Sequence, residues 1–217
     1  MAAAEAFARE AGAVTLRHFG GRVRHDDKAD GTPVTVADRE AEELLRDRIE
    51  GRFPGHGILG EEFGESPARV PVRWILDPID GTRSFMRGVP LYGVLIGVEV
   101  DGEPAVGVAH FPALAETVAA ATGLGCRWNG SLCTVSPVTD VRQALILTTD
   151  PVQADSSPVS RGWQELSARA ALVRTWGDCY GHILVATGRA DVMLDPVLSP
   201  WDAAPLLTIL TEAGGRF

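Results

Sequence analysis

Four short apolar runs between residues 74 and 122 constrain the fold more than any other feature. They are rich in Val, Ile, Leu and Ala, and Gly, Pro and Asp-Gly separate them, which is the pattern of short strands joined by turns. The runs are Trp74–Asp77, Tyr92–Val100, Pro104–Phe111 and Glu116–Thr122. They predict a mainly antiparallel sheet, and a further strand is predicted over Ala144–Asp150.

Helical patterns lie before and after this block. Helices are predicted over residues 1–19, after Thr35, and over 161–173, 180–187 and 202–213. Thr35 and Asp38 have the spacing of a capping box, with Asp in place of the usual Glu. Because helices and strands fall in separate blocks, we expect a layered α+β fold rather than alternating βαβ units. The 217 residues are expected to form a single domain, with approximate halves 1–135 and 136–217.

The charge balance excludes two classes of partner. The chain has 20 basic and 29 acidic residues, a net charge of −9, and its basic residues are scattered. Nucleic acid and anionic membrane are therefore not expected as partners. If the substrate is an anion, a metal ion, a helix N-terminus or a few arginines have to supply local positive charge.

The cysteines and the hydropathy predict a cytoplasmic protein. The three cysteines are odd in number and form no CxxC pair, so neither a disulfide framework nor a cysteine zinc site is indicated. Charged residues interrupt the apolar N-terminal segment, and no apolar run approaches the roughly 18 residues that span a bilayer.

The heptapeptide LDPIDGT, Leu76 to Thr82, follows the strand-like run VRWI. On this pattern Asp77 closes the strand and Asp80 follows after one turn, so that both carboxylates point into a common space. Asp-Pro and Asp-Gly are also common turn dipeptides, so a solvated turn is the simple alternative. Carboxylates at the edge of a core are costly unless something cationic compensates them.

Other acidic residues have equally simple explanations when each is taken alone. Glu61 and Glu62 fit a solvated loop, while Asp38 and Asp202 fit helix caps. Taken together with Asp77 and Asp80, they form a set of hard oxygen ligands without histidine or cysteine, which is what Mg²⁺ prefers. Such a cluster loaded with divalent cations attracts a phosphate and lowers the pKa of bound water. We therefore expect metal-assisted hydrolysis of a phosphate ester.

Several segments carry a resemblance to a known family. They cover nearly the whole chain: Gly31–Glu42, Phe53–Glu65, Trp74–Gly93, Gly177–Pro196 and Ser199–Gly215. The LDPIDGT stretch with the downstream WDAA is specific, whereas GEE alone is weak. On these motifs the chain resembles the inositol monophosphatase superfamily, and within it the bacterial histidinol-phosphatases most.

The resemblance implies a role for each matching residue. Two or three Mg²⁺ ions would be held by carboxylates and one backbone carbonyl: Glu61, Asp77, Ile79, Asp80 and Asp202. Glu61 and Thr82 would position the attacking water, with Asp38 hydrogen-bonded to the Thr82 hydroxyl. Asp80, Gly81 and Thr82 would also contact the phosphate.

The resemblance also implies a layered αβαβα sandwich, often present as a homodimer. Members of the family continue beyond the position of Phe217, so the sequence predicts a sandwich without the last strand and helix. For that reason a catalytically silent metal-binding or interaction protein is the alternative from another class.

The expected substrate is a small phosphorylated metabolite, most specifically L-histidinol phosphate. Asp178 and Asp195 match positions of the family's substrate pocket, and two carboxylates beside Trp176 suit an ammonium and an imidazole. Inositol phosphates or other sugar or nucleoside phosphates are the alternative, and a helix cap is the alternative role for Asp178. His182 is expected to be structural, and the roles of the arginines at 83, 87, 174 and 189 stay open.

Overall fold

An eight-stranded sheet forms the centre of the molecule. The computed structural model describes residues 1–21, 25–27 and 33–217, so Gly31 and Thr32 of the matched segments lie outside it. The strand order is β10-β9-β8-β7-β6-β5-β3-β4, and of these pairs β3 and β5 are parallel and the others antiparallel. The mainly antiparallel sheet is therefore confirmed. Its strands are β3 (Gly57–Gly60), β4 (Gly64–Ser66), β5 (Val72–Asp80), β6 (Gly93–Val100), β7 (Glu103–Phe111), β8 (Glu116–Ala121), β9 (Gly125–Trp128) and β10 (Ser131–Cys133).

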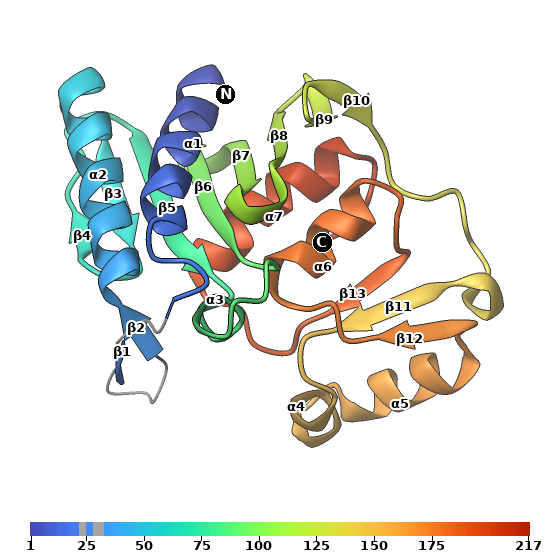
Figure 1. Ribbon diagram of the computed structural model, residues 1–217. Coiled ribbons are helices and arrows are strands. Elements are labelled where there is room, and N and C mark those ends of the chain that lie inside the picture. Colours follow the sequence, from blue (N-terminus) through green and yellow to red (C-terminus); the bar gives the residue numbers. More distant parts are fainter. Residues whose placement is uncertain (22–24, 28–32) are drawn as a thin grey trace.

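Helices cover both faces of this sheet (Figure 1). On one face α1 (Ala2–Leu16) and α2 (Val36–Arg52) pack through residues such as Phe7 and Leu45. On the other, α6 (Asp178–Ala186) and α7 (Pro200–Glu212) pack through residues such as Ile183 and Ile209. The alternating apolar residues of the strands supply both cores, which explains why the central runs are apolar almost throughout.

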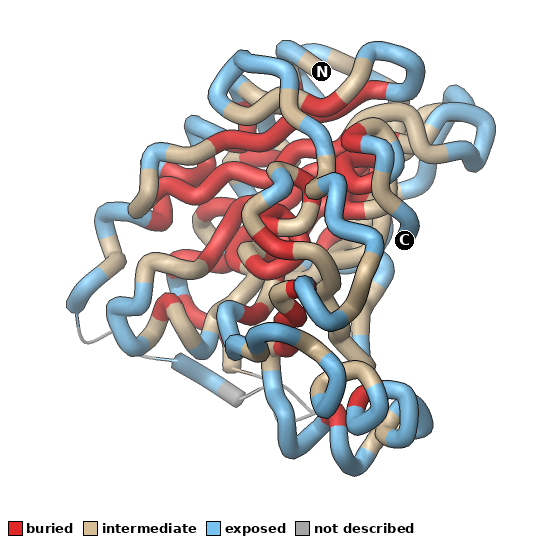
Figure 2. Tube along the Cα trace, turned by 90° about the vertical axis from the view of Figure 1, so that its right-hand side faces the viewer, coloured by how far each residue is buried: buried red, intermediate tan, exposed pale blue. Residues whose placement is uncertain are grey.

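A second, smaller sheet lies beyond α6. Its parallel strands are β11 (Leu145–Thr148), β12 (Leu172–Arg174) and β13 (Val192–Leu194), in the order β12-β11-β13. Its outer face packs against α4 (Pro151–Ser156) and α5 (Ser160–Arg169). The five layers form the expected αβαβα sandwich, and Figure 2 shows that burial is concentrated in the large sheet and its helices, with the α4–α5 end largely exposed.

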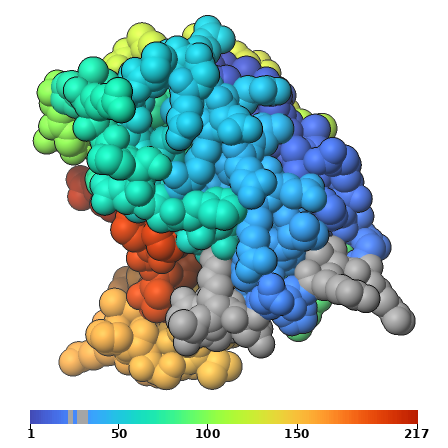
Figure 3. Space-filling view, turned by 90° about the vertical axis from the view of Figure 1, so that its left-hand side faces the viewer, coloured from blue at the N-terminus to red at the C-terminus, as the bar shows by residue number. Residues whose placement is uncertain are grey.

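The remaining elements are short. They are β1 (His25–Asp27) and β2 (Pro33–Thr35), which pair antiparallel, α3 (Thr82–Met86), and the 3₁₀ turns η1 (Pro112–Leu114) and η2 (Val141–Gln143). Among the described residues no helix is long and apolar enough to cross a membrane. In a space-filling view, the segment around the start of α7 (orange-red) reaches the surface between the α2 and β4 side and the α4–α5 layer (Figure 3).

Two sequence expectations about element boundaries were wrong. The helix predicted over 161–173 ends at Arg169, and residues 172–174 instead form β12, because they pair with β11 at the end of a parallel sheet. The strand predicted to close at Asp77 continues to Asp80, with a register shift between the two aspartates against β6. A bulge of this kind turns side chains without ending the strand.

Helix α7 crosses the large sheet at very short range. Where it passes β6, a Cβ atom on Gly97 would lie 3.2 Å from the Pro205 nitrogen. Where it passes β7, a Cβ atom on Gly107 would overlap the Pro205 carbonyl oxygen. These two glycines therefore set how closely α7, which carries Asp202, approaches the strands.

His110 in β7 is a buried histidine that is expected to titrate at low pH. Its Nδ1 donates to the Glu116 carbonyl at 3.1 Å and lies 2.9 Å from the Thr117 hydroxyl. Burial, with a smaller contribution from Arg9, lowers the pKa of His110 from 6.5 to about 4. The unfolded chain thus binds more protons between these pH values, so the free energy of unfolding falls as the pH drops from about 6.5 to 4.

We expect the His110→Asn variant to lose less stability on acidification than the parent protein. The asparagine amide can replace the Nδ1 donor without titrating. Over the full range from pH 6.5 to 4, the parent should lose about 3 kcal/mol more of its free energy of unfolding than the variant. Urea unfolding at several pH values between 4 and 6.5 measures it, with the exposed His25→Asn as a control. If the free energy of unfolding fell equally with pH in His110→Asn and in the parent, His110 would not be the cause of the pH dependence.

Candidate active site and metal centre

Most of the predicted site residues converge on one cavity of about 250 Å³. Eight of them line it, coming from the β3–β4 loop, from β5 and the start of α3, and from the first turns of α6 and α7: Glu61, Asp77, Ile79, Asp80, Gly81, Thr82, Asp178 and Asp202. Two predicted residues, Asp38 and Asp195, are not part of its lining. The convergence of distant segments favours a functional site over separate turns and caps.

The bulge in β5 aims Asp77 and Asp80 at this cavity. Asp77 Oδ1 accepts a hydrogen bond from the Ile79 N–H at 2.9 Å, which fixes the backbone between the two aspartates. Asp80 Oδ2 accepts from the Cys179 N–H at 2.5 Å, which ties β5 to α6. Gly81 then adopts a left-handed φ of 84°, a conformation that favours glycine, and α3 begins at Thr82.

Asp77, Asp80 and Asp202 form a close carboxylate triad. Each offers one oxygen, and these oxygens all lie within 4.8 Å of one another. Burial raises the pKa of Asp77 well above its usual value, and the charges of Glu61, Asp80 and Asp202 raise it further. Burial followed by the charges of Asp178 and Asp202 does the same to the pKa of Asp80.

Because burial and mutual repulsion disfavour ionisation of these carboxylates, a fully ionised triad requires a compensating positive charge. The donor set is composed of oxygen atoms, which is the set that Mg²⁺ prefers. Asp202 also keeps a structural role, because its Oδ2 accepts from the Ser199 N–H at 2.7 Å in a capping box at the start of α7. The cap and the metal-ligand role are compatible, since a carboxylate has two oxygens.

Glu42, a buried residue of α2, holds the loop that carries Glu61. Its two carboxylate oxygens accept hydrogen bonds from the Glu62 N–H at 2.7 Å and the Phe63 N–H at 3.2 Å, and Arg46 donates to it at 2.8 Å. A Cβ atom on Gly60 would overlap the Glu42 carboxylate. This role was not predicted from the sequence, although a glutamate between the buried Ala41 and Leu45 on the apolar face of a helix was a signal.

We expect the Glu42→Ala variant to lower both turnover and Mg²⁺ affinity by about tenfold or more. The Glu62 and Phe63 N–H groups lose their acceptor, and the loop that positions Glu61 loosens. Phosphate release against Mg²⁺ concentration and calorimetric Mg²⁺ binding measure the effect. Glu43→Ala, an exposed neighbour on the same helix, serves as the control. Unchanged Mg²⁺ dependence in Glu42→Ala would show that the loop is held by other contacts.

Asp38 and Thr82 lie close to each other, but their contact is long. The Thr82 hydroxyl donates to the Ile79 carbonyl at 3.0 Å, and its distance to Asp38 Oδ1 is 3.5 Å. The capping box predicted at the start of α2 is confirmed, because Asp38 Oδ2 accepts from the Thr35 N–H at 2.8 Å. Burial raises the pKa of Asp38 to about 6, near neutral pH.

Asp178 lies in the wall of the acidic cavity. It is the first residue of α6, which starts two residues earlier than predicted, and Gly177 rather than Asp178 occupies the N-cap. Asp178 Oδ2 accepts from the Ser84 hydroxyl at 3.3 Å, so its side chain bonds across to α3 and does not cap its own helix. Burial raises the pKa of Asp178 above its usual value.

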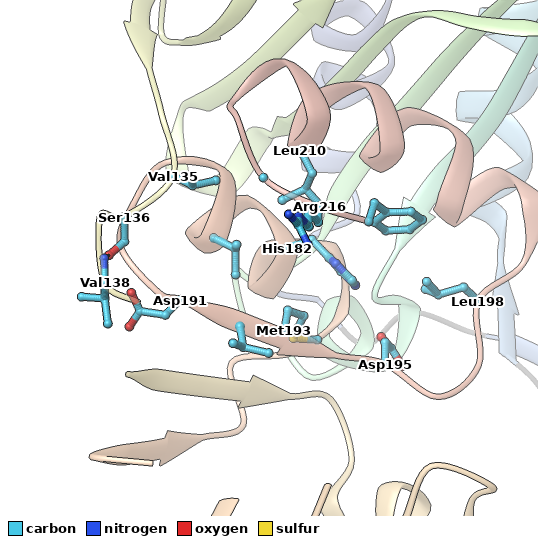
Figure 4. A pocket seen from close by; sticks show the side chains of 14 residues that line it. Val135, Ser136, Val138, His182, Asp191, Met193, Asp195, Leu198, Leu210 and Arg216 are labelled. Atoms are coloured by element: carbon cyan, nitrogen blue, oxygen red, sulfur yellow. The ribbon is translucent and has the colours of Figure 1, made fainter. Parts of the chain in front are cut away.

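Asp195 faces a different and larger space. It lines a mostly apolar cavity of about 600 Å³ together with residues such as His182 and Met193, as Figure 4 shows. Its Oδ2 accepts from the Thr149 hydroxyl at 2.8 Å. The charge of Asp178 contributes to raising the pKa of Asp195, after burial, so the two carboxylates are electrostatic neighbours. Burial lowers the pKa of His182 to about 4, in keeping with a structural residue.

The structure separates the four arginines whose roles were open. Arg83 lines the acidic cavity. Arg189 pairs with Glu116 at 2.9 Å and stacks over the Trp128 ring at 4.3 Å, which is a structural role. Arg87 and Arg174 donate to the carbonyls of Arg83 and Val173.

A sequence profile of the inositol monophosphatase family matches residues 1–217. This chain belongs to the inositol monophosphatase family. Two relatives named histidinol-phosphatase are 49% identical (Chlorobaculum parvum; 96% of this chain, 81% of the relative) and 37% identical (Mycobacterium tuberculosis; 97% and 84%). As a member of the family the chain is a phosphoric monoester hydrolase, and Mg²⁺ dependence is general to the family.

Solved structures of the family have the same fold. The extragenic suppressor protein suhB from Bartonella henselae superposes with a TM-score of 0.93 at 28% identity, over 100% of this chain and 85% of that one. An inositol monophosphatase from Zymomonas mobilis superposes with a TM-score of 0.86 at 31% identity, over 99% and 83%. The family and the layered fold expected from the sequence are both confirmed.

Proposed function

We propose that this inositol monophosphatase family member hydrolyses L-histidinol phosphate to L-histidinol and phosphate. The carrying observation is Asp178, a carboxylate in the wall of the acidic cavity that is outside the proposed metal-ligand set. A second carboxylate, Asp195, lies near it. A carboxylate beside a phosphate site, with a second carboxylate close to it, favours a phosphate ester that also carries cationic groups. The names of the relatives at 49% and 37% identity support the same substrate.

The site residues have two roles, and Glu61 and Asp80 take part in both. We assign Glu61, Asp77, the Ile79 carbonyl, Asp80 and Asp202 to Mg²⁺ binding, because their oxygens suit that ion and the triad lies within 4.8 Å. When bound, Mg²⁺ supplies positive charge for the phosphate and the leaving oxygen and lowers the pKa of water. With Mg²⁺ bound in this way, the acidic cavity would accept an anionic substrate.

The second role is to orient the attacking water and the phosphate. We assign the Thr82 hydroxyl and Glu61 to positioning the attacking water, with Asp38 behind Thr82 at 3.5 Å. Burial raises the pKa of Asp38 to about 6, and its carboxylate is the second acceptor within reach of the Thr82 hydroxyl, after the Ile79 carbonyl at 3.0 Å. Asp80, Gly81 and Thr82 line the space where the phosphate would lie.

The test compares L-histidinol phosphate with myo-inositol 1-phosphate, which is also a phosphate monoester but has no cationic group. Phosphate release is measured for both with Mg²⁺ and with EDTA. We expect kcat/KM to be at least about tenfold higher for L-histidinol phosphate, the ratio that one charge-assisted hydrogen bond supplies. A preference for the inositol ester would leave the hydrolytic chemistry in place and reject the proposed substrate.

The Asp178→Asn variant adds a second test. Losing its negative charge should raise KM for L-histidinol phosphate and leave KM for the inositol ester nearly unchanged. Equal changes for both substrates would remove Asp178 from the specificity argument. Homodimer formation remains a proposal from the family resemblance, and size-exclusion chromatography with light scattering measures it.

A further inference from the structure

Thr149, which directly follows β11, makes hydrogen bonds to the segments of both pocket carboxylates. Its hydroxyl donates to Asp195 Oδ2 at 2.8 Å and accepts from the Asp178 N–H at 2.9 Å. Asp195 lies just after β13 and Asp178 begins α6. One hydroxyl group therefore connects the ends of two neighbouring strands to the first residue of the helix that carries the cavity wall.

The contact between Thr149 and the start of α6 restricts the position of the backbone at Gly177 and Asp178. A Cβ atom on Gly177 would overlap the Thr149 Cα, so the backbone before α6 lies directly against Thr149. Asp178 itself adopts a φ of 51°, in the left-handed region that non-glycine residues rarely occupy. Because surrounding contacts have to hold such a conformation, the hydrogen bond from the Asp178 N–H to Thr149 helps to fix where this carboxylate points.

The contact on the strand side fixes the second carboxylate. Asp195 is partly buried, and the Thr149 hydroxyl occupies one of its two oxygens. The charge of Asp195 acts on the acidic cavity, because it contributes to raising the pKa of Asp202. In turn, the charge of Asp178 contributes to raising the pKa of Asp195. A threonine between the two aspartates thus links Asp178 in the wall of the acidic cavity to Asp195, which opens to the neighbouring cavity.

We propose that Thr149 is a positioning residue for substrate specificity, whose hydroxyl holds Asp178 and Asp195 together to recognise the cationic part of a phosphate monoester. This inference rests on the proposed function, because a substrate without a cationic group would not bind more tightly through Asp178 and Asp195. It does not involve the residues assigned to Mg²⁺ or to the attacking water. It therefore predicts an effect on binding of one substrate class and little effect on the chemical step.

The test uses two substitutions of Thr149. Thr149→Val keeps the shape and removes both hydrogen bonds, whereas Thr149→Ser keeps the hydroxyl. KM and kcat are measured with L-histidinol phosphate and with myo-inositol 1-phosphate. For Thr149→Val we expect about a tenfold rise in KM for L-histidinol phosphate, with kcat and the KM of the inositol ester changed less than about threefold. Thr149→Ser should retain KM within about threefold of the parent.

Thr148 provides a matched control in the adjacent position. It is fully buried, and within the described part of the chain its hydroxyl has no hydrogen-bond partner. Thr148→Val should therefore leave KM for both substrates unchanged. Thermal unfolding of each variant separates a folding defect from a specificity defect, and Thr149→Ser tests the same position if Thr149→Val does not fold.

The outcomes separate this inference from the proposed function. If the parent protein does not prefer L-histidinol phosphate, the proposed function fails and the inference fails with it. If the parent prefers it but Thr149→Val raises KM equally for both substrates, or lowers kcat instead, only the inference is overturned. Thr149→Ser behaving like Thr149→Val would also overturn it, because the hydroxyl would then not be the cause.

Discussion

Asp77→Asn is expected to abolish Mg²⁺-dependent phosphate release, with a fall in kcat of about a thousandfold. Asp77 is 2% exposed and belongs to the triad whose oxygens lie within 4.8 Å of one another. An asparagine offers only one neutral oxygen, and losing several kcal/mol of charge stabilisation in the transition state has this kinetic effect. Phosphate release at saturating Mg²⁺ and calorimetric Mg²⁺ binding measure the loss.

The same substitution should not damage the fold. Burial and the neighbouring carboxylates raise the pKa of Asp77, so its ionised form is unfavourable in the metal-free protein. Metal-free Asp77→Asn should then be at least as stable at pH 7.5 as the metal-free parent, and added Mg²⁺ should stabilise the parent but not Asp77→Asn. Asp101→Asn, in an exposed turn, is the control. Normal turnover in Asp77→Asn would reject the metal assignment.

Gly107→Ala is expected to lower the free energy of unfolding by about 3 kcal/mol. The added methyl group would overlap the Pro205 carbonyl oxygen, and relief requires α7 to move away from β7. Overpacking in a close-packed core typically costs 1–3 kcal/mol, and here the obstacle is backbone rather than a flexible side chain. Urea unfolding in EDTA measures the loss without a contribution from metal binding.

Moving α7 should also affect the site. Asp202 lies in the first turn of α7, so a shift of this helix separates it from Asp77 and Asp80, and Mg²⁺ affinity should fall as well. Gly51→Ala in α2 is the matched control, because an added Cβ atom would meet nothing within 4 Å there and alanine favours a helix. Unfolding of Gly107→Ala at the same urea concentration as the parent would show that α7 is not held at this distance.

The sequence predicted the fold class because its long segments have clear periodicity. The large antiparallel sheet matches the block of strand-like runs, and the capping box at Thr35 and Asp38 is present. The expectation that strands and helices do not alternate was wrong for the small sheet, whose parallel strands alternate with helices from β11 to α7. The three-residue strands β12 and β13 were missed because they are defined by parallel pairing with β11, which local sequence does not encode. Helix α4 was also missed, although Asp150 followed by Pro151 is a typical helix start.

The candidate site was predictable to the extent that its residues occur in motifs. Five residues of LDPIDGT line one cavity with Glu61 and Asp202: Asp77, Ile79, Asp80, Gly81 and Thr82. The bulge between Asp77 and Asp80 was not predicted. Asp-Pro also fits a turn, and only the pairing with β6 distinguishes a turn from a bulged strand. Glu42 and Thr149 were missed because each acts through contacts to residues distant in the chain, and a single polar residue carries no pattern.

The lengths of the outer strands have a consequence for how this protein can associate with itself. The large sheet ends in β4 on one side and β10 on the other, each of three residues, and β12 and β13 at the borders of the small sheet are equally short. Such short borders present few unpaired backbone groups to another chain, which disfavours growth of a continuous sheet between molecules. Any homodimer is therefore expected to form through helices and loops, and concentrated solutions are expected to resist fibrillar aggregation.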